Sequence, residues 1–179
     1  MKNAKLGIRL PFYFGGFFIM TIGIALSVKS NLGVSPVSSI PYTMTCVWGI
    51  EMGRATIIFH AILVAIQIAL LRRKFEIKNL LQILVGVVFG SFTTLCNSLV
   101  ALAPTPENLI IRLLMCWAGT VFVAFGIFFY VPANIMPLAG EGTMLAISSL
   151  PGKPFPKVKI AFDISMVCVS LVTCLFFLH

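Results

Sequence analysis

Residues 79–106 read NLLQILVGVVFGSFTTLCNSLVALAPTP and carry no charged side chain. An α-helix rises 1.5 Å per residue, so about 20 apolar residues cross the hydrocarbon core of a bilayer, which is about 30 Å thick. The uncharged run of 28 residues between Lys78 and Glu107 is therefore long enough to hold a transmembrane helix.

Runs of the same kind fill most of the remaining chain. Uncharged stretches of 19, 17 and 28 residues follow Arg9, Arg54 and Arg112. The 20 residues after Lys159 contain Asp163 as their only charge. Hydrophobic residues make up 59% of the 179 positions and charged residues 10%, whereas soluble domains are roughly half apolar and a quarter charged. The sequence thus predicts an all-α, polytopic membrane protein of about five transmembrane helices, at about 10–28, 55–71, 79–102, 109–131 and 157–178.

The basic residues indicate how the chain is oriented. They gather at 2–9, 72–78 and 153–159, and the short connection 103–108 has none. Lysine and arginine are enriched in cytoplasmic loops and are attracted by anionic lipid head groups. We therefore expect a multi-pass protein with a cytoplasmic amino terminus and an outward carboxyl terminus. On this interpretation the net charge of +8 points to membrane lipids as partners and not to nucleic acid.

Two further stretches are too short to span a membrane. Residues 33–53 and 132–156 are interrupted by glycine and proline at both ends, and their apolar middles cover only 42–48 and 143–150. Such segments are too apolar for a solvated loop, and backbone that does not span is tolerated at membrane depth where protein buries it. We expect two short helices that dip into the protein without crossing the membrane.

The chain also contains an internal repeat. A shift of 103 residues aligns segment 8–71 with segment 111–174 without a gap. The matches with most weight pair Arg9 with Arg112, Gly16 with Gly119, Gly23 with Gly126 and Asn31 with Asn134. Three expected membrane crossings separate the two starts, so the repeats should be inverted relative to each other, as in many secondary transporters. We expect one membrane domain over 1–179, with helix 79–102 between the repeat units.

Three motifs are shared with a known family. Residues 33–41 read GVSPVSSIP, residues 136–142 read MPLAGEG, and residues 157–163 read KVKIAFD. On these motifs the sequence resembles the YczE/YitT-type family of bacterial integral membrane proteins, which is largely uncharacterised. The resemblance covers nearly the whole chain and implies an inner-membrane protein of transport type without an established substrate. It also implies a sixth span beyond His179, the counterpart of helix 79–102; a truncated sequence and a true absence of that helix are both open.

Five polar residues within the repeats are candidates for binding a solute or carrying protons: Ser38, Ser39, His60, Glu141 and Asp163. The two serines and Glu141 occur near the starts of the short helices, where free N–H groups can bind an anionic or polar group. His60 can exchange protons near neutral pH, and Asp163 is its repeat partner 103 residues later. Ionisable groups within a span are costly, so those that are retained usually face a cavity. We expect the five to line a pathway between the repeats.

Each candidate also has a purely structural interpretation. Serine and glutamate are common at helix starts, where they cap N–H groups or favour the helix dipole. His60 shares one helix face with Thr56 and Gln67 and could bond a neighbouring helix. Asp163 could pair with Lys159 four residues earlier. Helix packing explains best the narrow polar face of the third span, which consists of Gln82, Gly86, Gly90, Thr93 and Asn97.

The leading functional hypothesis is a small-solute transporter or carrier of unknown substrate. A second is the substrate-binding membrane subunit of an energy-coupling-factor importer, although the first span lacks the AxxxA motif through which such subunits dock. A third is a non-transporting assembly or regulatory protein, and a homo-oligomer is open in every case. The sequence contains no HExxH, GxSxG or Walker A motif, and its five cysteines form no CxxC pair. We therefore expect no enzymatic activity, no metal site and no cofactor.

Overall fold

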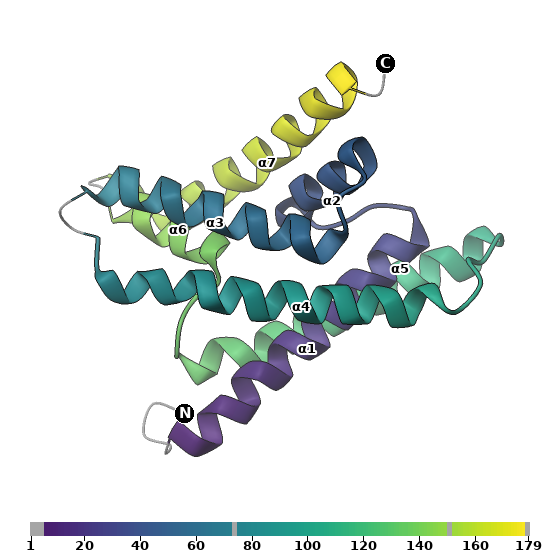
Figure 1. The fold of residues 1–179 in the computed structure, drawn as a ribbon, viewed down its shortest axis with the longest axis horizontal. Helices are drawn as coiled ribbons and strands as arrows, with labels where there is room; N and C mark the ends of the chain where they lie inside the picture. The colour runs from purple at the N-terminus through teal and green to yellow at the C-terminus, as the bar shows by residue number, and fades with distance from the viewer. Residues whose placement is uncertain (1–5, 73–74, 150–151, 178–179) are drawn as a thin grey trace. The chain divides into compact units, whose positions relative to one another are not determined.

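The computed structural model describes residues 6–72, 75–149 and 152–177, and every regular element in these residues is a helix (Figure 1). Five of the described helices are long and apolar enough to cross a membrane. They are α1 (Leu6–Ser30), α3 (Met52–Leu71), α4 (Leu81–Ala101), which the 3-10 turn η2 (Ile77–Leu80) precedes, α5 (Leu109–Ala133) and α7 (Phe155–Phe177). The predicted all-α, polytopic membrane class is confirmed. The basic residues Lys2, Lys5, Arg73 and Lys74 lie outside the described residues.

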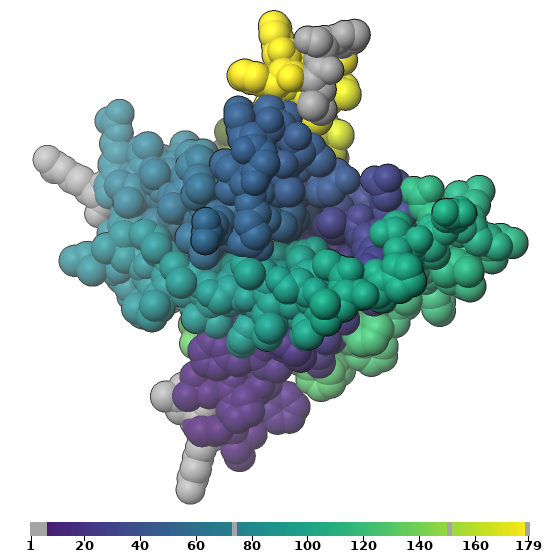
Figure 2. Space-filling model, turned by 45° about the vertical axis from the view of Figure 1, so that its right-hand side comes forward, coloured from purple at the N-terminus to yellow at the C-terminus, as the bar shows by residue number. Residues whose placement is uncertain are grey.

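Large apolar side chains of these helices face outward. On α4, Leu84, Leu95 and Leu99 are 62%, 47% and 53% exposed. Figure 2 shows the teal surface of this helix uncovered on the face in view. Exposing such an apolar surface to water would cost free energy, whereas contact with lipid tails has no such cost. The exposed apolar surface therefore agrees with a chain that lies in a bilayer.

The two short helices are present but begin earlier than the sequence predicts. Helix α2 covers Pro36–Trp48 and helix α6 covers Ala139–Ser148, in place of the expected helices over 42–48 and 143–150. Proline is favourable at the first position of a helix because its missing N–H has no partner there, so Pro36 starts α2 instead of interrupting it. At 1.5 Å per residue the helices are about 20 Å and 15 Å long. Neither can cross a hydrocarbon core of about 30 Å.

Contacts divide the chain into two compact units: Met1–Ser35 with Phe89–Ile135, and Pro36–Val88 with Met136–His179. Each contact unit contains parts of both repeat segments, 8–71 and 111–174. The predicted arrangement of one domain with two repeat units therefore stays a prediction. Helix α4 contributes its second part to the first unit and its first part to the second unit.

In the first unit, α1 and α5 pack side by side in opposite directions (Figure 1). Their backbones touch at two points, where Gly16 meets Gly126 and Gly23 meets Gly119. A Cβ atom on Gly16 would lie 2.8 Å from the carbonyl oxygen of Gly126, and one on Gly23 would lie 2.5 Å from that of Gly119. Real Cβ atoms do not come so close to backbone, so glycine allows this helix crossing.

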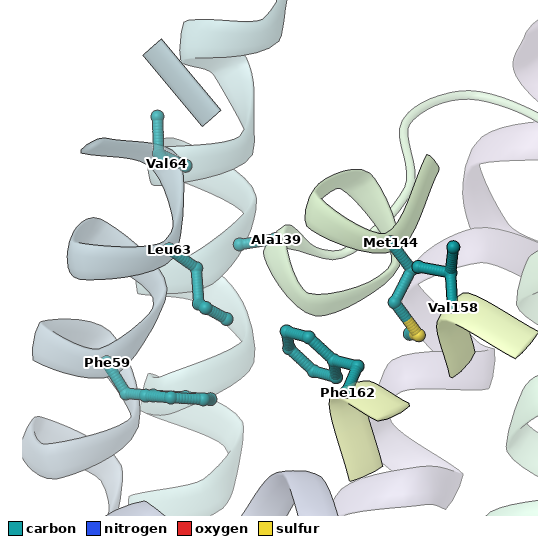
Figure 3. Close-up of a cluster of buried hydrophobic side chains, with 7 residues drawn as sticks. All are labelled: Phe59, Leu63, Val64, Ala139, Met144, Val158 and Phe162. Atoms are coloured by element: carbon teal, nitrogen blue, oxygen red, sulfur yellow. The ribbon is translucent and has the colours of Figure 1, made fainter. Parts of the chain in front are cut away.

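In the second unit, α2 packs on α7 and α6 packs on α3. A buried apolar cluster joins three of these helices (Figure 3). Phe59, Leu63 and Val64 come from α3, Ala139 and Met144 from α6, and Val158 and Phe162 from α7. The cluster holds the start of α6 against the middle of α3, which fixes the place of the polar residues described next.

Candidate functional site

Three buried polar side chains meet beside the start of α6. Gln67 of α3, Gln82 of α4 and Thr143 of α6 are 1%, 2% and 2% exposed. The Gln67 Nε2 group donates to Gln82 Oε1 at 2.9 Å, to the carbonyl oxygen of Ala139 at 3.1 Å and to Thr143 Oγ1 at 3.3 Å. We call Gln67, Gln82 and Thr143 the amide cluster. Buried amides are unfavourable unless they are hydrogen-bonded, so these bonds tie three helices together at one place.

Gly142 allows Gln82 to reach the amide cluster. A Cβ atom at position 142 would lie 2.6 Å from Gln82 Oε1 and 2.7 Å from Gln82 Nε2. Any side chain there would push the amide of Gln82 away from α6. The glycine in the first turn of this short helix therefore has a packing role that involves a polar side chain.

A cavity of about 460 Å³ lies beside the amide cluster. Gln67, Gln82 and Gly142 form part of its wall, and Glu76 and Lys78 lie at its exposed rim, where their side chains are 59% and 70% exposed. Lys78 Nζ and Glu76 Oε2 form an ion pair of 2.5 Å. The volume falls in the range of small-molecule sites, which is about 300–1,000 Å³.

The amide cluster leaves hydrogen-bonding capacity at the cavity wall. Gln67 uses its Nε2 group and Gln82 its Oε1 atom in the bond between them. Among the described residues, Gln67 Oε1 and Gln82 Nε2 have no hydrogen-bond partner. One is an acceptor and the other is a donor of two N–H groups. The wall can therefore bind a solute that offers both a donor and an acceptor.

Comparison with known proteins places the chain among membrane proteins. It matches over residues 7–179 the model of a family described as a family of unknown function, DUF6198. The chain belongs to this family. It is similar to the "Uncharacterized membrane protein YczE" of Bacillus subtilis (strain 168), with 28% identity over 152 residues, which are 84% of this chain and 67% of that protein. The resemblance to YczE-type proteins is thus confirmed, and no solved structure matches the chain.

In this DUF6198 member, His60 lies against α4. It is 4% exposed, and a Cβ atom on Gly86 would lie 2.9 Å from both its Cβ and its Nδ1 atom. The imidazole therefore fills the space that Gly86 leaves, seven residues or about two helix turns before Gln67 along α3.

Asp163 has the neighbour that its structural interpretation requires. Its Oδ2 atom accepts a hydrogen bond of 3.0 Å from Lys159 Nζ on the same helix. The side chains are 26% exposed for Asp163 and 51% for Lys159. Asp163 Oδ1 is buried and has no hydrogen-bond partner among the described residues. The carboxylate is therefore partly paired and partly available.

The other three candidates lie near the starts of the short helices. Ser39 of α2 donates to the carbonyl oxygen of Pro36 at 2.6 Å and contacts that of Met166 on α7 at 3.4 Å. Ser38 is half-buried in α2, and Glu141 is half-buried in the first turn of α6. The structure brings Ser39 to α7, the helix that carries Asp163. None of the five candidates lines the cavity beside the amide cluster.

The sequence contains a signal for two members of the amide cluster. Gln67 lies on the polar face of the second span and Gln82 on that of the third. The sequence favours helix packing as the role of the polar face on the third span, and the bond between the two glutamines does join two helices. Thr143 gives no signal, because a single threonine in a short apolar segment is ordinary until α6 is placed against α3.

Proposed function

We propose that this protein is a small-solute membrane transporter or carrier, and that it binds a polar solute at the cavity beside the amide cluster. The observation that carries the proposal is the pair of free amide atoms, Gln67 Oε1 and Gln82 Nε2, at the wall of a cavity among membrane helices. Polar groups retained at membrane depth are costly and usually mark the path of a solute or ion.

The contacts of the first unit support an inverted repeat. Arg9 bonds the carbonyl oxygens of residues 133 and 134, and Arg112 bonds those of residues 30 and 31. The shift of 103 residues relates the two arginines to each other, and it relates residue 30 to residue 133 and residue 31 to residue 134. Two copies of one motif related by a two-fold axis in the membrane plane would make such reciprocal contacts.

The second unit supports the same relation. The shift of 103 residues carries α2 onto α6 and α3 onto α7, and α2 packs on α7 while α6 packs on α3. Ser39 Oγ lies 3.4 Å from the carbonyl oxygen of Met166, and Thr143 Oγ1 lies 3.4 Å from that of Leu63. Leu63 and Met166 are repeat partners, 103 residues apart. Each short helix thus packs against the long helix of the other repeat. In this proposal α2 and α6 enter from opposite sides of a bacterial inner membrane, with the amino terminus in the cytoplasm.

The pathway predicted from Ser38, Ser39, His60, Glu141 and Asp163 stays part of the proposal. All five belong to the second unit, as the amide cluster does. Glu141 precedes Gly142, which lines the cavity, and Ser39 packs on the helix of Asp163. A solute that enters at the amide cluster would continue along the surfaces of α6 and α2.

A binding screen tests the proposal. The purified protein is heated in detergent with a panel of small solutes that carry amide, carboxyl or hydroxyl groups. A ligand at 100 times its dissociation constant stabilises the folded state by about 2.7 kcal/mol, so binders raise the unfolding temperature. We expect Gln82→Met to remove this effect. Asn97→Leu is the control, because among the described residues the Asn97 side chain bonds its own helix, at the carbonyl oxygen of Thr93, and does not line the cavity.

The proposal fails if no solute of the panel raises the unfolding temperature. It also fails if Gln82→Met responds to the binding solutes as strongly as the unchanged protein does.

A further inference from the structure

A second cavity, of about 420 Å³, lies where the chain enters α7. Its lining includes Lys153 and Pro154 of the preceding loop and Lys157 of the first helix turn. Val158 and Phe162 of α7 and Ile147 of α6 also line it. The cavity therefore has a basic part and an apolar part, and it shares no lining residue with the cavity at the amide cluster.

The described residues do not neutralise the basic part. Within the described ranges, Lys153 and Lys157 have neither a hydrogen bond from their ammonium groups nor an ion pair. No described acidic residue lines the cavity, and the nearby Asp163 is paired with Lys159. Two uncompensated positive charges beside one hollow favour an anionic group.

The apolar part continues along the helix. Val158 and Phe162 are each 6% exposed and belong to the buried cluster shown in Figure 3. Ala161, which is exposed, also lines the cavity. A small side chain at this point leaves room on the outer surface of α7 for a chain of methylene groups.

The level of the cavity in the membrane follows from α7. This helix is a candidate span that begins at Phe155, so Lys153 and Lys157 flank the boundary between the hydrocarbon core and the head groups. The phosphates of a bilayer lie at this level, and basic pockets between transmembrane helices bind anionic head groups. A soluble phosphate could contact the lysines but would gain nothing from the apolar part.

We propose that this cavity binds one anionic phospholipid, with its phosphate between Lys153 and Lys157 and the start of an acyl chain along Ala161 and Phe162. The site is independent of the proposed transport function. Each lysine near an anionic surface contributes to the free energy of lipid binding. Removing both lysines should weaken the affinity for the lipid about thirtyfold.

Native mass spectrometry tests the proposal directly. The full chain is incubated in detergent with equal amounts of phosphatidylglycerol and phosphatidylcholine, and the retained lipids are counted. We expect one phosphatidylglycerol per chain in the unchanged protein and its loss in the double variant Lys153→Gln/Lys157→Gln. The control is Arg72→Gln/Lys78→Gln, which removes the same charge from residues that do not line this cavity. The control should retain the lipid.

Two further measurements test the apolar part and the role of the lipid tail. Ala161→Phe keeps both lysines but fills the apolar part, so it should also lose the lipid, and it serves if the double lysine variant does not fold. Inorganic phosphate at millimolar concentration should not displace phosphatidylglycerol. Equal retention of the two lipids, unchanged retention in both variants, loss in the control, or displacement by phosphate would each overturn the proposal.

Discussion

Arg9 and Arg112 stand at opposite ends of the α1–α5 pair and make the same two hydrogen bonds. Arg9 donates from Nε to the carbonyl oxygen of Ala133 at 2.7 Å and from its terminal nitrogen to that of Asn134 at 2.5 Å. Arg112 donates likewise to Ser30 at 2.7 Å and to Asn31 at 2.8 Å. Each guanidinium thus binds the carbonyl end of the neighbouring helix, where the helix dipole favours a positive charge.

We predict that Arg9→Lys and Arg112→Lys each lower the free energy of unfolding by about 1–3 kcal/mol, and by similar amounts. Lysine has no planar pair of donors, so it loses a hydrogen bond that a charged donor makes, which is worth about 1.5–3 kcal/mol. Unfolding in mixed micelles of detergent and dodecyl sulfate measures the change. The control is Arg54→Lys on an exposed arginine at the start of α3. Full stability of either helix-end variant would contradict the prediction.

The glycines at the crossing of α1 and α5 give a second prediction. Gly16→Ala and Gly23→Ala should each destabilise the protein by about 1–3 kcal/mol, because the added methyl group meets backbone of the other helix. Gly15→Ala is a matched control, since a Cβ atom there meets nothing within 4 Å. Alanine favours a helix over glycine by about 1 kcal/mol, so the control should be neutral or more stable. Thermal unfolding in detergent compares the three variants, and equal behaviour would refute the close crossing.

The same residues show how far the sequence could predict the fold. The Arg, Gly and Asn pairs of the repeat make close contacts between α1 and α5, so the repeat carries packing information. The five long helices follow from the charge-free runs, because crossing a bilayer sets a minimum length.

What the sequence could not predict depends on how helices meet. Within the sequence Pro36 resembles a break, but proline at a first helical position starts a helix. Gln67 and Gln82 are 15 residues apart in sequence, and they meet because α3 and α4 turn their polar faces toward each other. Thr143 joins them only because the apolar cluster places α6 on α3. Periodicity along one helix contains no information on such a register.

Orientation can be tested with single cysteines. In a background without the five native cysteines, Glu107→Cys should react with a membrane-impermeant maleimide in whole cells, and Lys78→Cys should not. Both native side chains are exposed, so access depends on the side of the membrane. The basic residues around Lys78 predict that it lies in the cytoplasm. External labelling at position 78, or none at position 107 in intact and lysed cells alike, would reverse the assignment.

Asp163→Asn separates a structural role from a transport role. The pair with Lys159 is partly exposed, so its loss should change the stability by under about 1 kcal/mol. If Asp163 belongs to the pathway, transport should stop in this variant although folded protein remains in the membrane. Lys159→Gln is the companion variant, because it removes the same ion pair and keeps the carboxylate. Transport at the normal rate in Asp163→Asn would leave the ion pair as the whole role of this residue.

Uptake by purified protein in liposomes tests the central claim most directly. Proteoliposomes are incubated with a pool of small polar solutes, and mass spectrometry measures what they accumulate relative to protein-free liposomes. We expect at least one solute to accumulate, and the double variant Gln67→Met/Gln82→Met to reduce its uptake at least about tenfold, because two hydrogen bonds of about 1 kcal/mol each are lost. Asn97→Leu should transport normally. Accumulation of no solute, or uptake by the double glutamine variant at the unchanged rate, would contradict a transport site at the amide cluster.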